Sequence, residues 1–464
     1  MTVVDLNTVK KIHFIGIGGA GMRAIANIFI EKGYIVSGSD SKQTEITERF
    51  ARQGARICIG QRPENLADAE AVIVSTAIHP DNAEWQAARE RHLPILHRSD
   101  ALVHIMSWGK AIAVAGAHGK TTTSSMLGQV FIEGRLHPTI VIGGEVDYLH
   151  SNSTLGTGPY VIAEADESDG TFLKEHPAIA VVTNIDADHM DHYGSMAHVI
   201  AAFKQFIQRL DPQDGMAVLC FDNEHIRRLA SQVGRTYISY GFAEDAEYTA
   251  KNLYYKEGKH YFDVYRRQVL LGTVCLQVPG RHNVLNALAT IAVSLHCGLP
   301  FAEIAAALCH FHGAKRRFQT KGYVGTIRVV DDYAHHPTEI KATLAAAGDM
   351  GTHRVVCLFQ PHRYSRTQLL LEQFGTAFSN ADILVVTDIY GADEDPVPGV
   401  TGRLIVDKIK EKTGKSAVYI PHKEDILPFL QKEARPHDLI LTMGAGDIYR
   451  IGEAYITMAK GERM

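Results

Sequence analysis

The chain has 464 residues, 45% of them apolar and 21% charged, which is typical of a folded globular protein. At the usual scale of roughly 100 to 200 residues per domain, this length indicates about three domains. The formal net charge of −5, from 47 basic and 52 acidic residues, excludes a broad basic surface for nucleic acid. Neither a signal-peptide pattern nor a long apolar run is visible, so we expect a cytoplasmic protein that is not inserted in a membrane.

The six cysteines are scattered without C-x-x-C spacing, and we expect them to be reduced. They are Cys58, Cys220, Cys275, Cys297, Cys309 and Cys357. A local group of Cys309, His310 and His312 has no second pair of ligands at a suitable spacing, which favours a structural role over a zinc site.

The N-terminal segment begins with a predicted strand at Lys11–Gly16, continued by a glycine motif and a helical pattern. Gly16, Gly18 and Gly21 stand in G-x-G-x-x-G register, and Asp40 follows a second short strand. This pattern is typical of a Rossmann-type opening, in which glycines let the backbone approach a diphosphate and the acidic residue holds a ribose or base. From the residues alone, NAD, FAD, a UDP-sugar or no ligand at all would be compatible.

A second glycine turn follows the buried strand predicted at Ala111–Ala115. The turn contains Gly116 and Lys120, and a helix is predicted over Thr121–Glu133. Such a turn can cradle phosphate oxygens with backbone N–H groups, while the lysine adds a point charge and a hydroxyl can ligate Mg²⁺. The usual phosphate-loop consensus would place a glycine at Val114, so an ordinary strand-to-helix turn remains an alternative.

Two acidic clusters follow predicted strands at Tyr160–Ala163 and Ala178–Thr183. The first reads EADESDG from Glu164, and the second reads NIDADHMDH from Asn184. In an open α/β sheet, ligands bind at the carboxyl ends of parallel strands. A solvated loop and a magnesium site both explain these carboxylates, and the phosphate loop in the same sheet favours magnesium.

The remaining chain predicts a β-rich segment at 247–278, with turns at Gly258 and Gly272, and then a helix from Gly280. Asn283 and Asn286 lie three residues apart on this helix, where they could bind an adenine edge or cap the helix. The run KRRFQ from 315 is either a solvated face or a hinge whose arginine reaches phosphates. Further strands then predict a third, Rossmann-like sheet with polar residues at its strand ends.

Several motifs occur in one order along nearly the whole chain. They are GIGGAGM at 16–22, AGAHGKTTT at 115–123, EADESD at 164–169, NIDADHMDHY at 184–193, GRHNVLNALA at 280–289, KRRFQ, DDYAHHPTE at 331–339 and QPHRYSRT at 360–367. Together they resemble the Mur ligase family of ATP-dependent amide-bond-forming enzymes.

The resemblance implies an α/β fold of three domains. These would be a Rossmann-like UDP-sugar-binding domain at 1–107, a central ATP-binding P-loop domain with a mostly parallel sheet at 108–317, and a Rossmann-like domain for the incoming amino acid at 318–464. It also implies that ATP, two Mg²⁺ ions, UDP-N-acetylmuramic acid and L-alanine are bound. The sequence does not give the oligomeric state.

The resemblance also implies roles for individual residues. ATP would be bound by Gly116, His118, Gly119, Lys120, Thr121, Thr122, Asn283, Asn286, Arg317 and Asp332. The UDP-sugar would be bound by Gly16, Gly18, Gly19, Gly21, Met22, Asp40 and Ser75. Metal would be held by Thr121, Glu164 and His189. Tyr333, His335, Arg363 and Arg366 would orient the sugar carboxylate and L-alanine, and Lys120, His335, Arg363 and Arg366 would be catalytic.

The sequence departs from the family pattern at three positions. Ala117 and Arg23 stand where members often carry threonine and serine, which we interpret as tolerated variation. Several sister ligases use a carbamylated lysine on the helix after the DH motif. Here Phe203 occupies that position and Lys204 points about 100° away, so no carbamylated lysine is expected.

The implied reaction is attack of the UDP-N-acetylmuramic acid carboxylate on the γ-phosphate of ATP, followed by displacement of phosphate from the acyl phosphate by L-alanine. Three alternatives compete with this reaction: a ligase that attaches a recycled murein tripeptide to the same sugar nucleotide, a nicotinamide-dependent oxidoreductase, and a non-catalytic nucleotide-binding protein. The oxidoreductase leaves Lys120, Glu164 and the asparagine helix unexplained, and Lys120, Glu164 and His189 argue against the non-catalytic protein.

Overall fold

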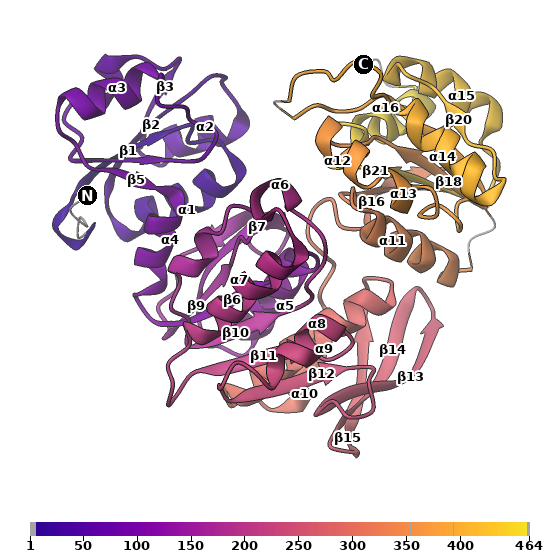
Figure 1. Cartoon of the computed structure of the whole chain (residues 1–464), viewed down its shortest axis with the longest axis horizontal. Helices are drawn as coiled ribbons and strands as arrows, with labels where there is room; N and C mark the ends of the chain where they lie inside the picture. The colour runs from indigo at the N-terminus through magenta and orange to yellow at the C-terminus, as the bar shows by residue number, and fades with distance from the viewer. Residues whose placement is uncertain (1–5, 352–353, 393, 462–464) are drawn as a thin grey trace. The chain divides into compact units, whose positions relative to one another are not determined.

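The structure is a computed structural model that describes residues 6–351, 354–392 and 394–461. It contains three sheets, of five, ten and six strands, which follow one another along the chain (Figure 1). The chain divides into two compact units. One comprises Met1–Lys251, Asp263–Val274 and Leu285–Cys309, and the other Asn252–Phe262, Cys275–Val284 and His310–Met464. The predicted α/β fold of three domains with mostly parallel sheets is confirmed.

The first sheet is parallel, with strand order β3-β2-β1-β4-β5. Its elements are β1 (Lys11–Ile15), α1 (Ala20–Lys32), β2 (Ile35–Asp40), α2 (Glu45–Arg52), β3 (Arg56–Ile59), β4 (Ala71–Val74), α3 (Ala83–Glu90), β5 (Ile95–His97) and α4 (Arg98–Met106). Strand β3 was not predicted. Its residues are exposed or half-buried, so no buried apolar run marks it.

The second sheet has the order β15-β14-β13-β12-β11-β10-β6-β9-β7-β8. Its elements are β6 (Lys110–Ala115), α5 (Lys120–Glu133), β7 (Thr139–Val146), β8 (Ser151–Thr154), β9 (Tyr160–Glu164), β10 (Ile179–Val182), α6 (Met190–Tyr193), α7 (Met196–Gln208), β11 (Met216–Cys220), α8 (Glu224–Ala230), β12 (Tyr237–Gly241), β13 (Tyr248–Lys256), β14 (Lys259–Arg266), β15 (Val269–Leu276), α9 (Arg281–His296) and α10 (Phe301–Cys309). Strand β6 pairs in parallel with both β9 and β10. The segments that follow these three strands therefore meet at one edge of the sheet.

One predicted turn was wrong. Gly258 lies in the turn between β13 and β14, but Gly272 lies inside strand β15. The second turn falls instead at Arg267 and Gln268, which have φ angles of 45° and 70°. A Cβ atom at position 272 would lie 2.8 Å from the ring of Phe301, so close packing explains that glycine.

The third sheet has the order β16-β17-β21-β18-β19-β20, and only β16 is antiparallel among its described pairs. Its elements are β16 (Gln319–Val324), β17 (Ile327–Asp332), α11 (Pro337–Asp349), β18 (Arg354–Phe359), α12 (Tyr364–Leu369), α13 (Leu371–Phe374), β19 (Ile383–Val386), α14 (Arg403–Thr413), β20 (Val418–Tyr419), α15 (Ile426–Glu433), β21 (Asp438–Met443) and α16 (Tyr449–Ala459). Consecutive residues of the central strands, such as Val329 and Val330, belong to two separate hydrophobic clusters. The sheet is thus buried on both faces, as parallel sheets are.

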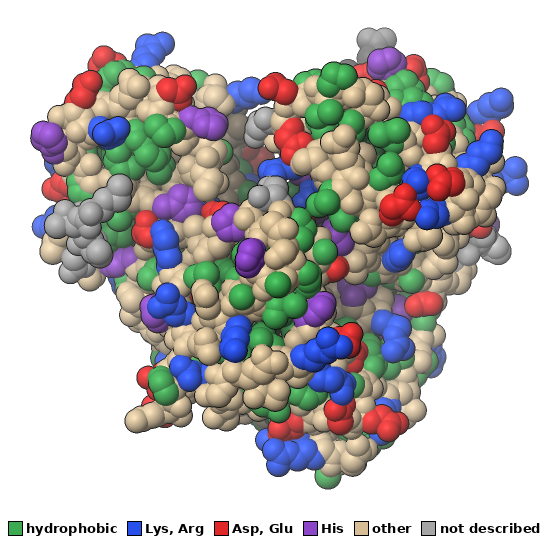
Figure 2. Space-filling model, in the orientation of Figure 1, with side chains coloured by type: hydrophobic (Ala, Val, Ile, Leu, Met, Phe, Trp, Pro, Cys, Tyr) green, Lys and Arg blue, Asp and Glu red, His purple; other side chains and the backbone are tan. Residues whose placement is uncertain are grey.

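The surface carries charges of both signs. On the face shown in Figure 2, Lys and Arg side chains are interspersed with Asp and Glu, as expected from the small net charge of −5. Among the described residues, no helix has the length and apolar character needed to cross a membrane.

Candidate active site

The phosphate loop joins the buried strand β6 to helix α5. Gly116 has a φ of 137° and Gly119 a φ of 84°, and Gly119 caps α5 without a side-chain hydrogen bond. A side chain would be strained at either position. The first-turn N–H groups of α5 have no partner within the helix, so the helix offers them, with its positive dipole end, to an anion.

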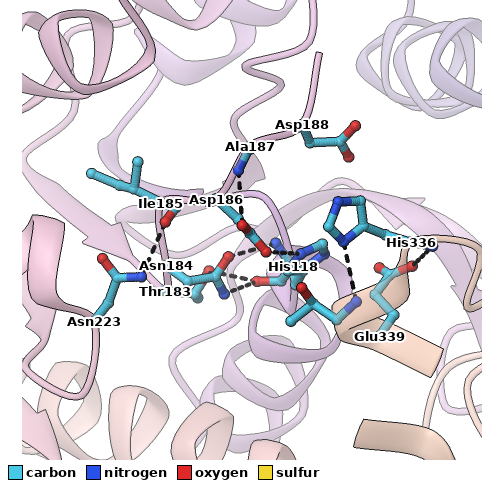
Figure 3. Close-up of polar contacts among 12 residues, drawn as sticks. His118, Thr183, Asn184, Ile185, Asp186, Ala187, Asp188, Asn223, His336 and Glu339 are labelled. Atoms are coloured by element: carbon cyan, nitrogen blue, oxygen red, sulfur yellow. Dashed lines mark hydrogen bonds and ion pairs between the residues drawn. The ribbon is translucent and has the colours of Figure 1, made fainter. Parts of the chain in front are cut away.

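The two residues that follow the neighbouring strand β10 hold this loop in place by hydrogen bonds. The His118 carbonyl accepts hydrogen bonds from Thr183 Oγ1 at 2.6 Å and from Asn184 Nδ2 at 2.8 Å, while the His118 N–H donates to Asn184 Oδ1 at 2.9 Å (Figure 3). The His118 ring contacts Asp186 Oδ2 at 3.1 Å. Asn184 and Thr183 were not predicted as site residues, although their position directly after a strand beside β6 is the signal that identifies them.

Lys120 is paired with an acidic side chain of the EADESD segment. Its Nζ donates to Glu167 Oε1 at 2.7 Å and to the Gly116 carbonyl at 2.7 Å. Burial by itself lowers the pKa of the Lys120 ammonium, but nearby carboxylates outweigh it and raise that pKa above its ordinary value. Burial raises the pKa of the Glu167 carboxyl against the opposing charge of Lys120. The lysine is therefore held charged and close to the loop.

The predicted metal ligands form two groups. Thr121 Oγ1 donates to Glu164 Oε1 at 2.9 Å, and the other oxygen of Glu164 accepts from the Gly143 N–H at 2.6 Å. His189 Nε2 lies 3.7 Å from Glu167 Oε1 and 3.6 Å from Asp188 Oδ2. A hydroxyl and carboxylates at the mouth of a phosphate loop fit the oxygen preference of Mg²⁺.

An arginine at the start of helix α4 also reaches the acidic segment. Arg98 Nη2 contacts Asp166 Oδ2 at 2.5 Å, and both side chains are largely buried. Although burial alone would raise the pKa of the Asp166 carboxyl, Arg98 and Lys120 lower it well below the ordinary value. Sequence reasoning missed Arg98, which has no motif of its own.

The predicted adenine ligands lie on helix α9. Asn286 accepts from Thr123 Oγ1 at 3.2 Å, and its side chain lies so close to Gly119 that a Cβ there would be 2.6 Å from Asn286 Oδ1. It thus packs directly against the phosphate loop. Asn283 donates to the carbonyl of Pro279 at 2.6 Å, just before the helix. Both side chains are buried, and their adenine role stays a prediction.

The position that corresponds to the carbamylated lysine of the sister ligases lies in helix α7. The Phe203 side chain is buried, with its ring centroid 5.4 Å from that of Phe172. Lys204 is only half-buried. An aromatic core contact therefore accounts for Phe203.

The N-terminal glycine motif forms a tight turn between β1 and α1. Gly16 has a φ of 76°, and its N–H donates to the Ser39 carbonyl at 2.9 Å. The Gly18 N–H donates to Asp40 Oδ2 at 2.9 Å. Asp40 therefore supports the loop at the start of α1, where a diphosphate would bind.

The other residues predicted to bind the UDP-sugar differ in how far they are exposed. The Met22 side chain is buried and packs beside the turn, since a Cβ atom at Gly19 would lie 3.8 Å from Met22 Cγ. Ser75 is half-buried and its carbonyl accepts from the Ile78 N–H at 3.1 Å. Gly19 is exposed at the N-terminus of α1 and Gly21 lies in its first turn.

The predicted amino-acid ligands lie at the carboxyl ends of β17 and β18. The rings of Tyr333 and His335 are 5.5 Å apart, and His335 is also 5.5 Å from His362. Arg366 Nη1 lies 3.0 Å from His362 Nδ1. Arg363, which is exposed, precedes α12 with a φ of 68°. The structure thus links Tyr333, His335 and Arg366 through His362, a member of the QPHRYSRT motif that was not singled out, whereas the exposed Arg363 is not placed against them by these contacts.

The two residues predicted to reach ATP from this unit have partners inside it. Arg317 Nη1 lies 3.8 Å from Glu339 Oε1. Asp332 accepts from the N–H groups of Phe318 at 2.7 Å and Ala334 at 2.8 Å. Asp332 therefore orders the turn after β17, and its contact with ATP stays a prediction.

The ionisation of Asp332 should also make the stability of this unit depend on pH. Burial raises the pKa of its carboxyl to about 6, against the opposing charge of Arg317. Because the native pKa exceeds the unfolded value, the stabilisation is full below the unfolded pKa and is lost as pH rises through about 6. Relative to Asp332→Asn, the wild type should be about 1.4 kcal/mol more stable at pH 5 than at pH 7.5.

Hydrogen exchange of buried amides in β17 and β21 measures this difference locally. After correction for intrinsic exchange, the ratio of wild-type to variant protection should be about tenfold higher at pH 5 than at pH 7.5. A ratio that is flat, or that rises with pH, would show that Asp332 is not the titrating group.

Three family models match consecutive segments of the chain. The Mur ligase family catalytic domain matches residues 11–108, the Mur ligase middle domain 114–294, and the Mur ligase glutamate ligase domain 316–446. A UDP-N-acetylmuramate--L-alanine ligase of Pelotomaculum thermopropionicum is 49% identical over 444 residues, which cover 96% of each chain.

Solved structures are similar over the same length. The UDP-N-acetylmuramate-alanine ligase of Thermotoga maritima has a TM-score of 0.82 and 31% identity, covering 97% of this chain and 99% of its own. A murein peptide ligase from Psychrobacter arcticus has a TM-score of 0.71 and 22% identity, covering 98% of this chain and 100% of its own. At that identity the second likeness shows the fold alone.

Proposed function

Because the chain belongs to the Mur ligase family, we propose that it is an ATP-dependent ligase that joins L-alanine to UDP-N-acetylmuramate in peptidoglycan precursor synthesis. The observation that carries the proposal is the convergence of the phosphate loop, Lys120 and the Thr121–Glu164 pair at one edge of the second sheet. Its similarity to ligases of this name over nearly the whole chain supports the choice of substrates.

In the proposed reaction, the sugar carboxylate attacks the γ-phosphorus of ATP, and ADP leaves. The amine of L-alanine then attacks the acyl carbon, phosphate leaves, and the amine loses its proton as the amide forms. Lys120 offsets the repulsion between the two anions in the first step. His335, Arg363 and Arg366 are proposed to orient the carboxylates and donate hydrogen bonds to the tetrahedral intermediate.

Magnesium is proposed to be held by Thr121, Glu164 and His189. When bound, it would neutralise charge on the phosphate oxygens. The chain's own part is to present a hydroxyl and a carboxylate 2.9 Å apart beside the loop. We further propose that the glycine motif with Asp40 binds the UDP moiety. The proposed domains divide at 107/108 and at 317/318. The proposed place of action is the cytoplasm.

A coupled assay tests this function. Release of ADP and phosphate should require both UDP-N-acetylmuramic acid and L-alanine, and turnover that is independent of either would contradict the proposal. The murein tripeptide should neither replace L-alanine nor compete with it. Tripeptide use in preference to L-alanine would assign the recycling reaction instead, and reduction of NAD⁺ would assign an oxidoreductase.

A further inference from the structure

Glu167 has a position that the proposed reaction does not yet explain. Its side chain is 97% buried, and Oε1 faces two partners: Lys120 Nζ at 2.7 Å and His189 Nε2 at 3.7 Å. Its second oxygen, Oε2, is buried and has no hydrogen-bond partner among the residues that the structure describes. A buried acceptor without a donor costs free energy in this state of the protein. A ligand that binds to the atom in another state would remove that cost.

The neighbouring acidic residues are already committed. Asp166 is paired with Arg98 at 2.5 Å, and Glu164 accepts hydrogen bonds from Thr121 and from the Gly143 N–H. Lys120 is the ammonium group in contact with Glu167. A buried carboxylate that loses its cation is strongly unfavourable, so a second cation at Glu167 would make it easier for Lys120 to turn toward a phosphate.

His189 alone is a poor site for Mg²⁺, which prefers oxygen ligands. Glu167 brings a carboxylate next to the imidazole, with one oxygen unpartnered. We propose that Glu167 and His189 together hold the second magnesium ion, and that Glu167 exchanges Lys120 for this ion when ATP binds. This inference rests on the proposed function and adds a ligand to its metal set.

Direct metal binding tests the exchange without any turnover. Mn²⁺ can replace Mg²⁺ at oxygen-rich sites and is followed by electron paramagnetic resonance. With a non-hydrolysable ATP analogue, the wild type should bind two Mn²⁺ ions. Glu167→Gln should weaken the second ion at least about tenfold while the first remains. If Glu167→Gln binds both ions as tightly as the wild type does, the inference is overturned.

Glu175→Gln is the matched control. Glu175 is also buried, and its Oε2 has no hydrogen-bond partner among the described residues, but the ion pairs of Lys120 and His189 are with Glu167 and not with Glu175. This variant should bind both Mn²⁺ ions as the wild type does. If it loses the second ion to the same extent as Glu167→Gln, the effect comes from general disturbance of the segment and the inference fails.

A second variant tests the competition with Lys120. Without nucleotide, Lys120→Met should bind Mn²⁺ at least about tenfold more tightly than the wild type, because the competing ammonium is gone. The double variant Lys120→Met/Glu167→Gln should lose this gain. An unchanged affinity in Lys120→Met would overturn the exchange. If the wild type binds no Mn²⁺ even with the nucleotide analogue, the proposed function itself is contradicted.

Discussion

Replacing Lys120 with methionine is expected to lower ligase activity by at least about 10²-fold, because the γ-phosphate loses its point charge in the transition state. The change should also lower the free energy of unfolding by about 3 kcal/mol. The reason is that Glu167, itself 97% buried, loses the ammonium 2.7 Å away. Steady-state kinetics and denaturant unfolding measure the two effects. Retention of activity would mean that the phosphate role is misplaced.

The double variant Lys120→Met/Glu167→Gln separates the two losses. With the buried charge removed, most of the lost stability should return while activity stays absent. Lys174→Met is the control, since Lys174 contacts Asp100 at 2.7 Å but both side chains are more than one-third exposed. It should change stability by less than about 1 kcal/mol and leave activity intact. A double variant as unstable as Lys120→Met would exclude Glu167 as the cause.

Gly116→Ala is expected to weaken nucleotide binding and to destabilise the phosphate loop. The glycine has a φ of 137°, and a Cβ atom there would lie 2.1 Å from Thr183 Oγ1 and 3.0 Å from the Asn184 nitrogen. Thr183 in turn donates to the His118 carbonyl, so relieving the clash displaces the loop itself. We expect a loss of stability of about 2–3 kcal/mol and ATP affinity reduced at least about tenfold.

Gly33→Ala provides the comparison for that variant. Gly33 ends α1 with a φ of 94°, and no atom of the described part of the chain lies within 4 Å of its added Cβ. This change should cost only the backbone strain, about 1 kcal/mol, and ATP affinity by calorimetry should be unchanged. If both alanine variants bind ATP equally well, the geometry of the loop is not what creates the nucleotide site.

Local sequence patterns were sufficient for much of the fold. The run Ala111–Ala115 and the glycine turn after it predicted β6 and α5 to within a residue or two. Burial on both faces of a parallel strand leaves an apolar run that can be read directly. Strand β3 lacks such burial and was missed, and Gly272 was mistaken for a turn because its reason is a distant contact with Phe301.

The sequence alone determined which chemistry the chain carries: glycine turns for phosphates, a lysine, and acidic segments after strands. Only the tertiary structure decided how these groups pair. It placed β6 between β9 and β10, and so brought Lys120 to Glu167 and Thr121 to Glu164 across more than 40 residues of chain. Pairing of this kind depends on strand order and on side-chain burial, which arise from packing between distant segments rather than from local propensity.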